Sequence, residues 1–308
     1  MGMWNRTAET LSRDELAALQ LKGLQKSLRR VWCNEFYRQR LSVKGISSPE
    51  DIKSLDDLSK LPFFTKDDFR DAYPLKMNCV DRKELMEFHQ SSGSTGTPVV
   101  MAYTKNDLNQ WAECMARCYA MAGLEKGDAF QIMPTFGLFN GGFGCYHGCR
   151  KAHLFCVPAS SGNTERQIMF IQDLQATILC CTPSYAAYLS ETIHERGLRD
   201  QIKLKAGIFG AEAWSQQMRE DIEKGLGIKA YDIYGLTEIS GPGVAFECEA
   251  QTGMHINEDH FIAEIIDPET GEVLPEGSKG ELVFSCITKE AFPLLRYRTK
   301  DICVLTDP

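Results

Sequence analysis

The sequence predicts an α/β fold with a mostly parallel sheet flanked by helices and a smaller β-rich, barrel-like part at its end. Between residues 105 and 235, short apolar runs rich in β-branched residues alternate with helical patterns, which is typical of βαβ units. After residue 241 the helical patterns stop and strand-like runs and turns follow one another. We therefore expect an α/β body over residues 1–240 and a β-rich subdomain over residues 241–308.

Composition narrows the classes of function. The 308 residues are 43% hydrophobic and carry a formal net charge of −8, so the chain can bury a core, while nucleic acid and anionic membranes are poor partners. The twelve cysteines are scattered, and several lie in apolar runs, which favours a reduced, cytoplasmic chain. We see no targeting signal or membrane-spanning run. A small-molecule partner fits best, and a homodimer stays open.

The first seventy residues predict helices. Ser12 and Glu15 form a capping-box pattern before leucines at helical spacing, which predicts one long amphipathic helix over residues 13–40. A short helix is expected over residues 54–61. The pair Thr65 and Asp68 marks the start of another helix.

A loop of small residues follows, in the run "HQSSGSTGTPVV". Its hydroxyls, glycines and free backbone N–H groups suit a loop that wraps an anion such as phosphate, although a flexible turn has the same composition. The runs "EFHQSS" and "TPVVMAYT" predict a strand on each side. Because no lysine follows Gly96, this is not the P-loop of nucleotide triphosphatases.

Polar residues also stand where three predicted strands end. In "YDIYGLTEIS", Thr237 and Glu238 follow a strand, and the run "FGAEAWS" follows another. In "RYRTKDI" we expect Asp301 at a third strand end. Ligands of parallel sheets bind at the carboxyl ends of the strands, so these residues are binding candidates. Between the last two motifs, "FIAEIIDPETGEVL" predicts a hairpin that turns at residues 268–271.

The motifs "SSGSTGTP", "YGLTE" and "YRTKD", in this order, resemble those of the adenylate-forming enzymes, which include acyl-CoA ligases and luciferases. The further runs "LPFFTKDDFRDAYP", "FGLFNGGFG", "GNTERQI", "CCTPSYAAYL", "FGAEAWS" and "GMHINEDHF" resemble the phenylacetate-CoA ligase family more closely. The resemblance covers residues 16–302. It implies the N-terminal adenylation domain of such an enzyme, extending over residues 1–308.

The resemblance implies an activity and its cofactors. A carboxylate, aromatic and phenylacetate-like, would attack the α-phosphorus of ATP to give an acyl-adenylate, and coenzyme A would then take the acyl group. Thr237 would contact the α-phosphate, and Glu238 would hold Mg²⁺, since hard cations prefer carboxylate oxygen. The Asp301 carboxylate would accept hydrogen bonds from both ribose hydroxyls. The loop residues that would close over the β- and γ-phosphates are Ser92, Gly93, Ser94, Thr95, Gly96 and Thr97.

Two further groups follow from the same resemblance. Adenine would lie against Gly210, Ala211 and Glu212 on one face and Tyr234 on the other, with Gly235 beside it. The residues that would shape the acid pocket are Phe136, Gly137, Gly141 and Tyr185. Each has an ordinary structural alternative: Phe136 and Tyr234 could be core residues, Glu238 a helix N-terminal charge, and Asp301 a turn cap.

Cys248 and His255 are candidate zinc ligands, with His260 a weaker one, although two ligands do not complete a zinc site. Family members resembling this chain continue into a lid domain that carries a catalytic lysine, and nothing of that kind follows Asp301. The resemblance thus predicts nucleotide binding with adenylate formation that is slow or absent. Two alternatives remain: an adenylyltransferase acting on another acceptor such as a deazaflavin cofactor, and a non-catalytic module that binds nucleotide or acid.

Overall fold

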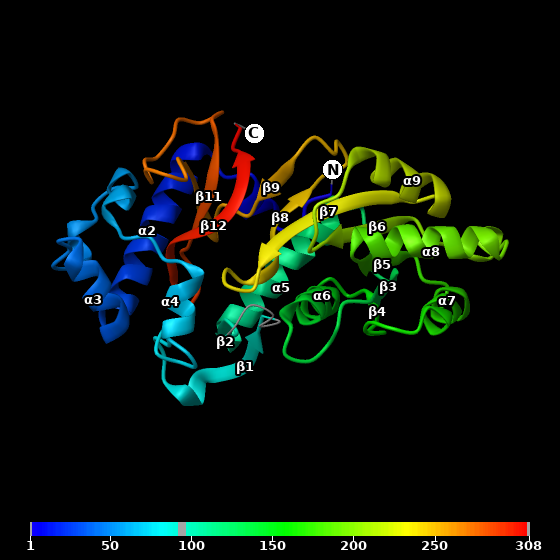
Figure 1. Cartoon of the computed structure of the whole chain (residues 1–308), viewed down its shortest axis with the longest axis horizontal. Coiled ribbons are helices and arrows are strands. Elements are labelled where there is room, and N and C mark those ends of the chain that lie inside the picture. The colour runs from blue at the N-terminus through cyan, green and yellow to red at the C-terminus, as the bar shows by residue number, and fades with distance from the viewer. Residues whose placement is uncertain (1, 92–96, 307–308) are drawn as a thin grey trace. The chain divides into compact units, whose positions relative to one another are not determined.

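The structure is a computed structural model that describes residues 2–91 and 97–306 (Figure 1). The chain forms two compact units. Unit 1 comprises Met1–Asn5, Trp111–Leu236 and Ser240–Ile256, and unit 2 comprises Arg6–Gln110, Thr237–Ile239 and Asn257–Pro308. The predicted α/β class is confirmed, because unit 1 contains a mostly parallel sheet and unit 2 contains small antiparallel sheets, one of them near the C-terminus.

In the described part of unit 1, seven strands form one sheet in the order β4-β3-β5-β6-β7-β8-β9. The first five of these are parallel to one another, and β8 and β9 continue the sheet antiparallel. The strands are β3 (Ala129–Ile132), β4 (Phe155–Val157), β5 (Ile178–Cys181), β6 (Ala206–Gly210), β7 (Lys229–Leu236), β8 (Gly241–Glu247) and β9 (Met254–Ile256).

Helices cover both faces of this sheet (Figure 1). On one face, Leu179 and Cys181 of β5 share a hydrophobic core with apolar side chains of three helices, namely α7 (Thr164–Asp173), α8 (Pro183–Glu195) and α9 (Gln216–Leu226). On the other face, Cys180 Sγ lies 3.3 Å from Cys145 Sγ of α6 (Asn140–Lys151). Alternate residues of β5 thus face opposite layers, as strand geometry requires.

The N-terminal part of unit 2 is helical, and here one prediction is wrong. Residues 13–40 form two helices, α2 (Arg13–Trp32) and α3 (Glu35–Val43), where the sequence predicted one. The Asn34 side chain accepts a hydrogen bond from the Phe36 backbone N–H and so begins a new helix. Its amide also donates to the carbonyls of Lys76 and Asn78, which fixes the break. The predicted capping box of Ser12 and Glu15 is present at the start of α2.

Short helical segments complete this region of unit 2. The predicted helix over residues 54–61 is a 3₁₀ segment, η2 (Asp56–Lys60), and the helix expected after Thr65 is α4 (Lys66–Asp71), with its capping box in place. The remaining segments are α1 (Arg6–Glu9), η1 (Pro49–Asp51) and η3 (Arg82–Glu84) in unit 2, and η4 (Arg199–Gln201) in unit 1. Helix α5 (Lys105–Met121) contributes its residues from Trp111 onward to unit 1.

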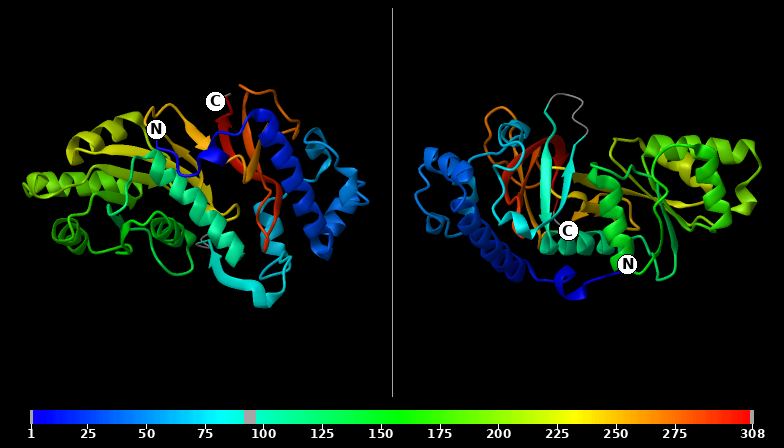
Figure 2. Two further views of the ribbon diagram at one scale, coloured as in Figure 1. Left: turned by 180° about the vertical axis from the view of Figure 1, so that it is seen from behind. Right: turned by 90° about the horizontal axis from the view of Figure 1, so that it is seen from below.

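Two small antiparallel sheets lie in the part of unit 2 that the structure describes. The predicted strands around the small-residue loop are present and pair with each other as β1 (Leu85–Gln90) and β2 (Val100–Thr104). The second sheet has the order β10-β11-β12, with β10 (Phe261–Ile266), β11 (Lys279–Cys286) and β12 (Leu294–Val304). Figure 2 shows α2 lying along this sheet. Ser27 Oγ of α2 donates to the carbonyl of Ile287, just after β11.

The C-terminal predictions need two corrections. The turn at residues 268–271 is present, closed by backbone N–H groups that donate to the Asp267 carboxylate, but the second arm of the expected hairpin is reduced to one bridge between Ile266 and Val273. The true partner of β10 is β11. Asp301 lies inside β12, three residues before its last residue Val304, and not at a strand end. Among the described residues, no helix combines the length and apolar character that crossing a membrane demands.

Candidate active site

The candidate residues Thr237 and Glu238 lie in a short segment of unit 2 that follows β7 directly in the chain. Both are buried, with Glu238 only 5% exposed. Its Oε1 lies 3.9 Å from Nζ of Lys66, the first residue of α4. The hydroxyl of Tyr297 in β12 lies near the same carboxylate. A buried carboxylate therefore stands beside a cation and a phenol.

The pKa of Tyr297 reflects this environment. Burial raises the pKa of Tyr297 well above its usual value, and the carboxylates of Glu238 and Asp301 raise it further, while Arg70 lowers it. The phenol therefore stays protonated beside Glu238. Its ring packs edge-to-face on Phe69 of α4, with 5.7 Å between the ring centroids.

Helix α4 also contacts the end of the small-residue loop. Arg70 Nε donates to the backbone carbonyl of Thr97, at 3.3 Å. The helix is fixed at its start, where Asp68 accepts from the Thr65 N–H at 2.7 Å and forms an ion pair with Arg40. Within unit 2, one short helix thus brings a lysine to Glu238 and an arginine to Thr97. The other predicted loop residues, Ser92, Gly93, Ser94, Thr95 and Gly96, lie outside the described residues.

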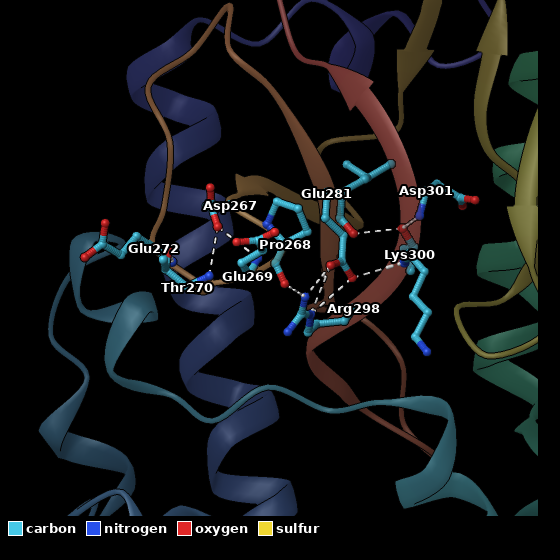
Figure 3. Close-up of polar contacts among 11 residues, drawn as sticks. Asp267, Pro268, Glu269, Thr270, Glu272, Glu281, Arg298, Lys300 and Asp301 are labelled. Carbon is cyan, nitrogen blue, oxygen red and sulfur yellow. Dashed lines mark hydrogen bonds and ion pairs between the residues drawn. The ribbon is translucent and has the colours of Figure 1, made fainter.

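Asp301 is exposed, and it lies where β12 bulges. Glu281 pairs with Ile302 and Val283 pairs with Arg298, so residues 299–301 of β12 all stand opposite one residue of β11. A bulge of this kind re-aims side chains and is common beside functional sites. In Figure 3 the Asp301 carboxylate points away from Glu281.

In unit 1, two of the predicted nucleotide residues have a packing reason to be glycine. A Cβ on Gly210, the last residue of β6, would lie 2.4 Å from the Ile233 carbonyl oxygen of β7. A Cβ on Gly235 of β7 would lie 1.9 Å from the Gly241 carbonyl oxygen of β8. Any side chain would force these strands apart, so both glycines keep adjacent backbones close.

The loop after β6 carries Ala211 and Glu212, both exposed. Ala211 has a φ of 71°, in the left-handed region that favours glycine. The Glu212 carboxylate accepts a 2.7 Å hydrogen bond from the backbone N–H of Ser184 in the first turn of α8, where an anion is favourable. Tyr234 in β7 is half-buried. This loop is therefore tethered through Glu212 to the start of α8.

The acid-pocket candidates lie in unit 1. Phe136 packs against Phe143 and Tyr146 of α6 in edge-to-face geometry, with ring centroids 5.3 and 6.3 Å apart. Its backbone N–H donates to Ser160 Oγ at 3.3 Å. Gly137 is exposed at a φ of 134°, and Gly141 is half-buried at the start of α6, where an added Cβ would meet the Phe139 ring.

Tyr185 of α8 is half-buried, and its hydroxyl lies 3.2 Å from Thr164 Oγ1 of α7. Burial raises the pKa of Tyr185, which keeps the hydroxyl protonated. Its ring lies 6.2 Å from that of Tyr188, one turn further along α8. Tyr185 thus belongs to the layer of α7 and α8, while Phe136 packs on α6.

The metal candidates differ in setting. Glu238 is the carboxylate expected to hold Mg²⁺, and it is buried as described above. Cys248 is buried after β8 and His255 is exposed on β9. His260 belongs to unit 2, where its Nδ1 lies 3.0 Å from Thr288 Oγ1. Across residues 2–91 and 97–306, no group of three or more His, Cys, Asp or Glu side chains is placed to hold a metal ion.

Sequence reasoning missed two residues of the Glu238 cluster, Lys66 and Tyr297. A signal existed for Lys66, because it directly follows the N-cap residue Thr65 and is thus the first residue of a predicted helix. Tyr297 lies in the quoted run "RYRTKDI", in which Asp301 was the stronger candidate because it is the one acidic residue. Neither proximity could be read from spacing, since these residues are more than fifty positions from Glu238 in the chain.

Comparisons with known proteins identify the family of this chain. The family model described as AMP-binding enzyme matches residues 30–287. The phenylacetate-coenzyme A ligase of Pseudomonas putida is 48% identical over 297 residues, which cover 96% of this chain and 67% of that protein. The proteins of the same name from Aromatoleum evansii and Escherichia coli K12 are 49% and 43% identical and are covered to 69% and 68%. The chain thus spans about two thirds of these relatives.

Among solved structures, 2-hydroxyisobutyryl-CoA ligase in an open conformation, in complex with 2-HIB-AMP and CoA, superposes with a TM-score of 0.92 at 25% identity. The match covers 99% of this chain and 74% of that one. The family expected from the motifs is therefore confirmed. The chain belongs to the AMP-binding enzymes and, within them, to the phenylacetate-CoA ligase family of AMP-forming acid–CoA ligases.

Proposed function

We propose that this chain binds ATP and an aromatic acid of the phenylacetate type and joins them to an acyl-adenylate, which coenzyme A then converts to a thioester. Residues 1–308 would serve as the adenylation domain. The observation that carries the proposal is the buried Glu238 carboxylate of unit 2, with Lys66 and Tyr297 beside it. Family membership, with relatives named phenylacetate-coenzyme A ligase, supports the same reaction.

In the first step, a carboxylate oxygen of the acid would attack the α-phosphorus of ATP. The bond from that phosphorus to the bridging oxygen breaks, and pyrophosphate leaves. The protein would position the two reactants and stabilise charge, which suffices for transfer at phosphorus. Lys66 would place positive charge near the phosphate oxygens, and Thr237 would contact the α-phosphate. In the second step the sulfur of coenzyme A attacks the acyl carbon, and AMP leaves.

Glu238 suits a magnesium ion. Mg²⁺ in nucleotide sites is held by one or two carboxylates, and phosphates and water supply the other ligands. Such an ion would neutralise charge on the phosphates when bound. Until then Lys66 and Tyr297 compensate the buried carboxylate, which would otherwise be costly. We propose that the surrounding residues hold the Glu238 carboxylate oxygens in position to bind the ion.

The proposed nucleotide roles divide between the units. In unit 2, residues 92–97 would bind the β- and γ-phosphates and Asp301 the two ribose hydroxyls. In unit 1, Gly210, Ala211, Glu212, Tyr234 and Gly235 would bind adenine.

The aromatic cluster of Phe136, Phe143 and Tyr146 favours an aromatic acid. Its rings meet edge-to-face at 5.3 and 6.3 Å, and a substrate ring could add to such an arrangement. Tyr185 and the turn with Gly137 and Gly141 would shape the rest of the pocket. A zinc ion at Cys248 and His255 would need further ligands, and metal analysis of the purified chain tests it.

The experiment is a search for products. The chain is incubated with Mg·ATP, coenzyme A and one of several acids: phenylacetate, benzoate, a short aliphatic acid, or none. We expect AMP and a phenylacetyl thioester with phenylacetate, and less product with the aliphatic acid. AMP without a thioester would favour transfer of the acyl group to an acceptor other than coenzyme A. Nucleotide binding without free AMP would favour an adenylyltransferase, which leaves AMP on its acceptor, or a non-catalytic module.

A further inference from the structure

A buried carboxylate supports the bulge that carries Asp301. Glu281 of β11 is 2% exposed. Its Oε1 accepts from the backbone N–H of Lys300 at 3.1 Å, and both of its oxygens accept from the Arg298 guanidinium (Figure 3). Arg298 also donates to the Pro268 carbonyl at 2.7 Å, so the same ion pair is anchored to the turn after β10.

The bulge needs this support. Residues 299–301 leave the ladder between β11 and β12, and backbone N–H groups that leave a ladder require other acceptors. The Lys300 N–H uses Glu281, and the Asp301 N–H uses Thr299 Oγ1 at 3.0 Å. Thr299 Oγ1 itself donates to the Leu282 carbonyl at 2.8 Å.

Lys300 has a backbone conformation in the bulge that is locally unfavourable for a residue with a side chain. Its φ is 66°, in the left-handed region that side chains other than glycine seldom adopt. Such a conformation persists only where surrounding contacts determine it, and it is frequent at ligand-binding positions. The hydrogen bond from Lys300 to Glu281 is such a contact. Without it, β12 could relax and redirect the next residue, Asp301.

We propose that Glu281 is a positioning residue for nucleotide binding: by holding the Lys300 backbone and Arg298, it presents the Asp301 carboxylate to two adjacent hydroxyl groups, as a ribose offers. The inference rests on the proposed function, in which Asp301 takes the ribose. It adds that ribose recognition depends on a buried side chain that touches no ligand. Thr299 acts with Glu281, through the Asp301 N–H.

A second ion pair in the same sheet provides a matched control. Glu264 of β10 binds Arg296 of β12 through both oxygens, each at 3.0 Å, and both residues are largely buried. Arg296 donates onward to the carbonyls of Ser59 and Leu61. These hydrogen bonds lead to the segment before α4 and not to residues 299–301. Loss of this pair should therefore affect stability without a specific effect on Asp301.

The experiment compares ATP with 2′,3′-dideoxy-ATP, both with Mg²⁺, by calorimetric titration of the whole chain. The variants are Glu281→Gln, Glu264→Gln and Asp301→Ala. An amide replaces one acceptor oxygen by a donor, so Glu281→Gln leaves either the Lys300 N–H or Arg298 Nη2 without its acceptor. The pair Thr299→Val and Thr299→Ser supplies a second test, because only serine retains the hydroxyl. The readout is the ratio of the two dissociation constants, which a general loss of stability leaves unchanged.

We expect wild type to prefer ATP and Asp301→Ala to lose that preference. Glu281→Gln and Thr299→Val should each reduce the preference about tenfold, the order expected for loss of a charge-assisted hydrogen bond. Glu264→Gln and Thr299→Ser should retain it. A wild-type ratio in Glu281→Gln, with the preference lost in Asp301→Ala, would overturn the proposal while leaving the ribose role of Asp301 intact.

Other results separate the two claims. If Asp301→Ala binds both nucleotides as wild type does, the ribose assignment itself is wrong and the positioning role falls with it. Hydrogen exchange without nucleotide then tests separately whether Glu281 holds the Lys300 backbone. Glu281→Gln should speed exchange at the Lys300 amide about tenfold. Unchanged exchange at Lys300 would contradict the support that Glu281 is proposed to give.

Discussion

Lys66 Nζ of α4 lies 3.9 Å from Oε1 of Glu238, a carboxylate that is almost completely buried. The lysine side chain keeps 44% of its surface exposed, so it can compensate Glu238 and still meet a ligand. Because the pair is partly open to solvent, its contribution to stability is small. We propose that its importance lies in the charge that it offers to phosphate. Its members are the first two residues to test.

Glu238→Gln should weaken Mg·ATP binding about tenfold or more, because the amide is a poor ligand for a hard cation. The fold should persist, since glutamine has nearly the same size and shape as glutamate. Calorimetry with and without Mg²⁺ measures the effect. The loss should appear only when Mg²⁺ is present, and equal affinities of variant and wild type for Mg·ATP would rule out the metal role of Glu238.

Lys66→Met should lower the affinity for ATP more than the affinity for AMP, because the lost charge is proposed to serve the phosphates. We expect an effect of about tenfold on ATP, the usual order for one charge-assisted contact. Lys60→Met is the control, since Lys60 is an exposed lysine paired with Asp57 in the preceding 3₁₀ segment. If both variants bind ATP alike, Lys66 has no phosphate role.

Phe136→Ala should raise the Kd for phenylacetate and leave that for Mg·ATP unchanged. The substitution removes the ring that packs on Phe143 and Tyr146, which reduces the aromatic contact area of the proposed acid pocket. Phe155→Ala is the control, because Phe155 in β4 is an exposed phenylalanine of the same unit. A parallel loss of affinity for ATP would mean that Phe136 supports the fold and does not shape the pocket.

Lys289 gives a prediction about pH. Burial lowers the pKa of this ammonium from its usual 10.5 to about 8, against the opposing effect of Asp107. Between these two pH values the unfolded chain binds the proton and the folded chain does not, so stability should rise with pH. The largest slope is about 1.4 kcal/mol per pH unit.

Lys289→Met isolates this contribution. The stability of wild type minus that of the variant should increase between about pH 8 and about pH 10 in urea unfolding. Below about pH 8 the difference should be flat, because both states carry the proton. The substitution also removes the hydrogen bond from Lys289 to the Ile239 carbonyl, at 3.3 Å, and the contact with the Tyr103 ring, at 4.3 Å. A difference that stays constant across this range would contradict the lowered pKa.

The alternation of strands and helices was readable from sequence because period and caps are local properties. The start of α2 at Ser12 and of α4 at Thr65 follows from capping boxes that are both present. The break at Asn34 was not readable in the same way. Its amide is held by the carbonyls of Lys76 and Asn78, more than forty residues on, so a tertiary contact ended a locally continuous pattern.

The site shows the same division. The segment with Thr237 and Glu238 could be proposed from the sequence because polar residues directly follow an apolar strand. The predicted strand end at Asp301 was wrong, because residues 299–301 form a bulge whose Lys300 N–H is bonded to Glu281 in the neighbouring strand. Lys66 reaches Glu238 only through the folding of unit 2. The proximity of two residues so far apart in the chain cannot be predicted from the spacing of residues in the sequence.

The most direct test of the central claim is the phenylacetate-dependent incorporation of labelled pyrophosphate into ATP, which requires reversible formation of an acyl-adenylate and detects even slow turnover. We predict incorporation by the wild-type chain with phenylacetate and Mg²⁺, little without acid, and a strong reduction in Glu238→Gln. No incorporation above the acid-free control, by a chain that binds both Mg·ATP and phenylacetate, would contradict the proposed activity.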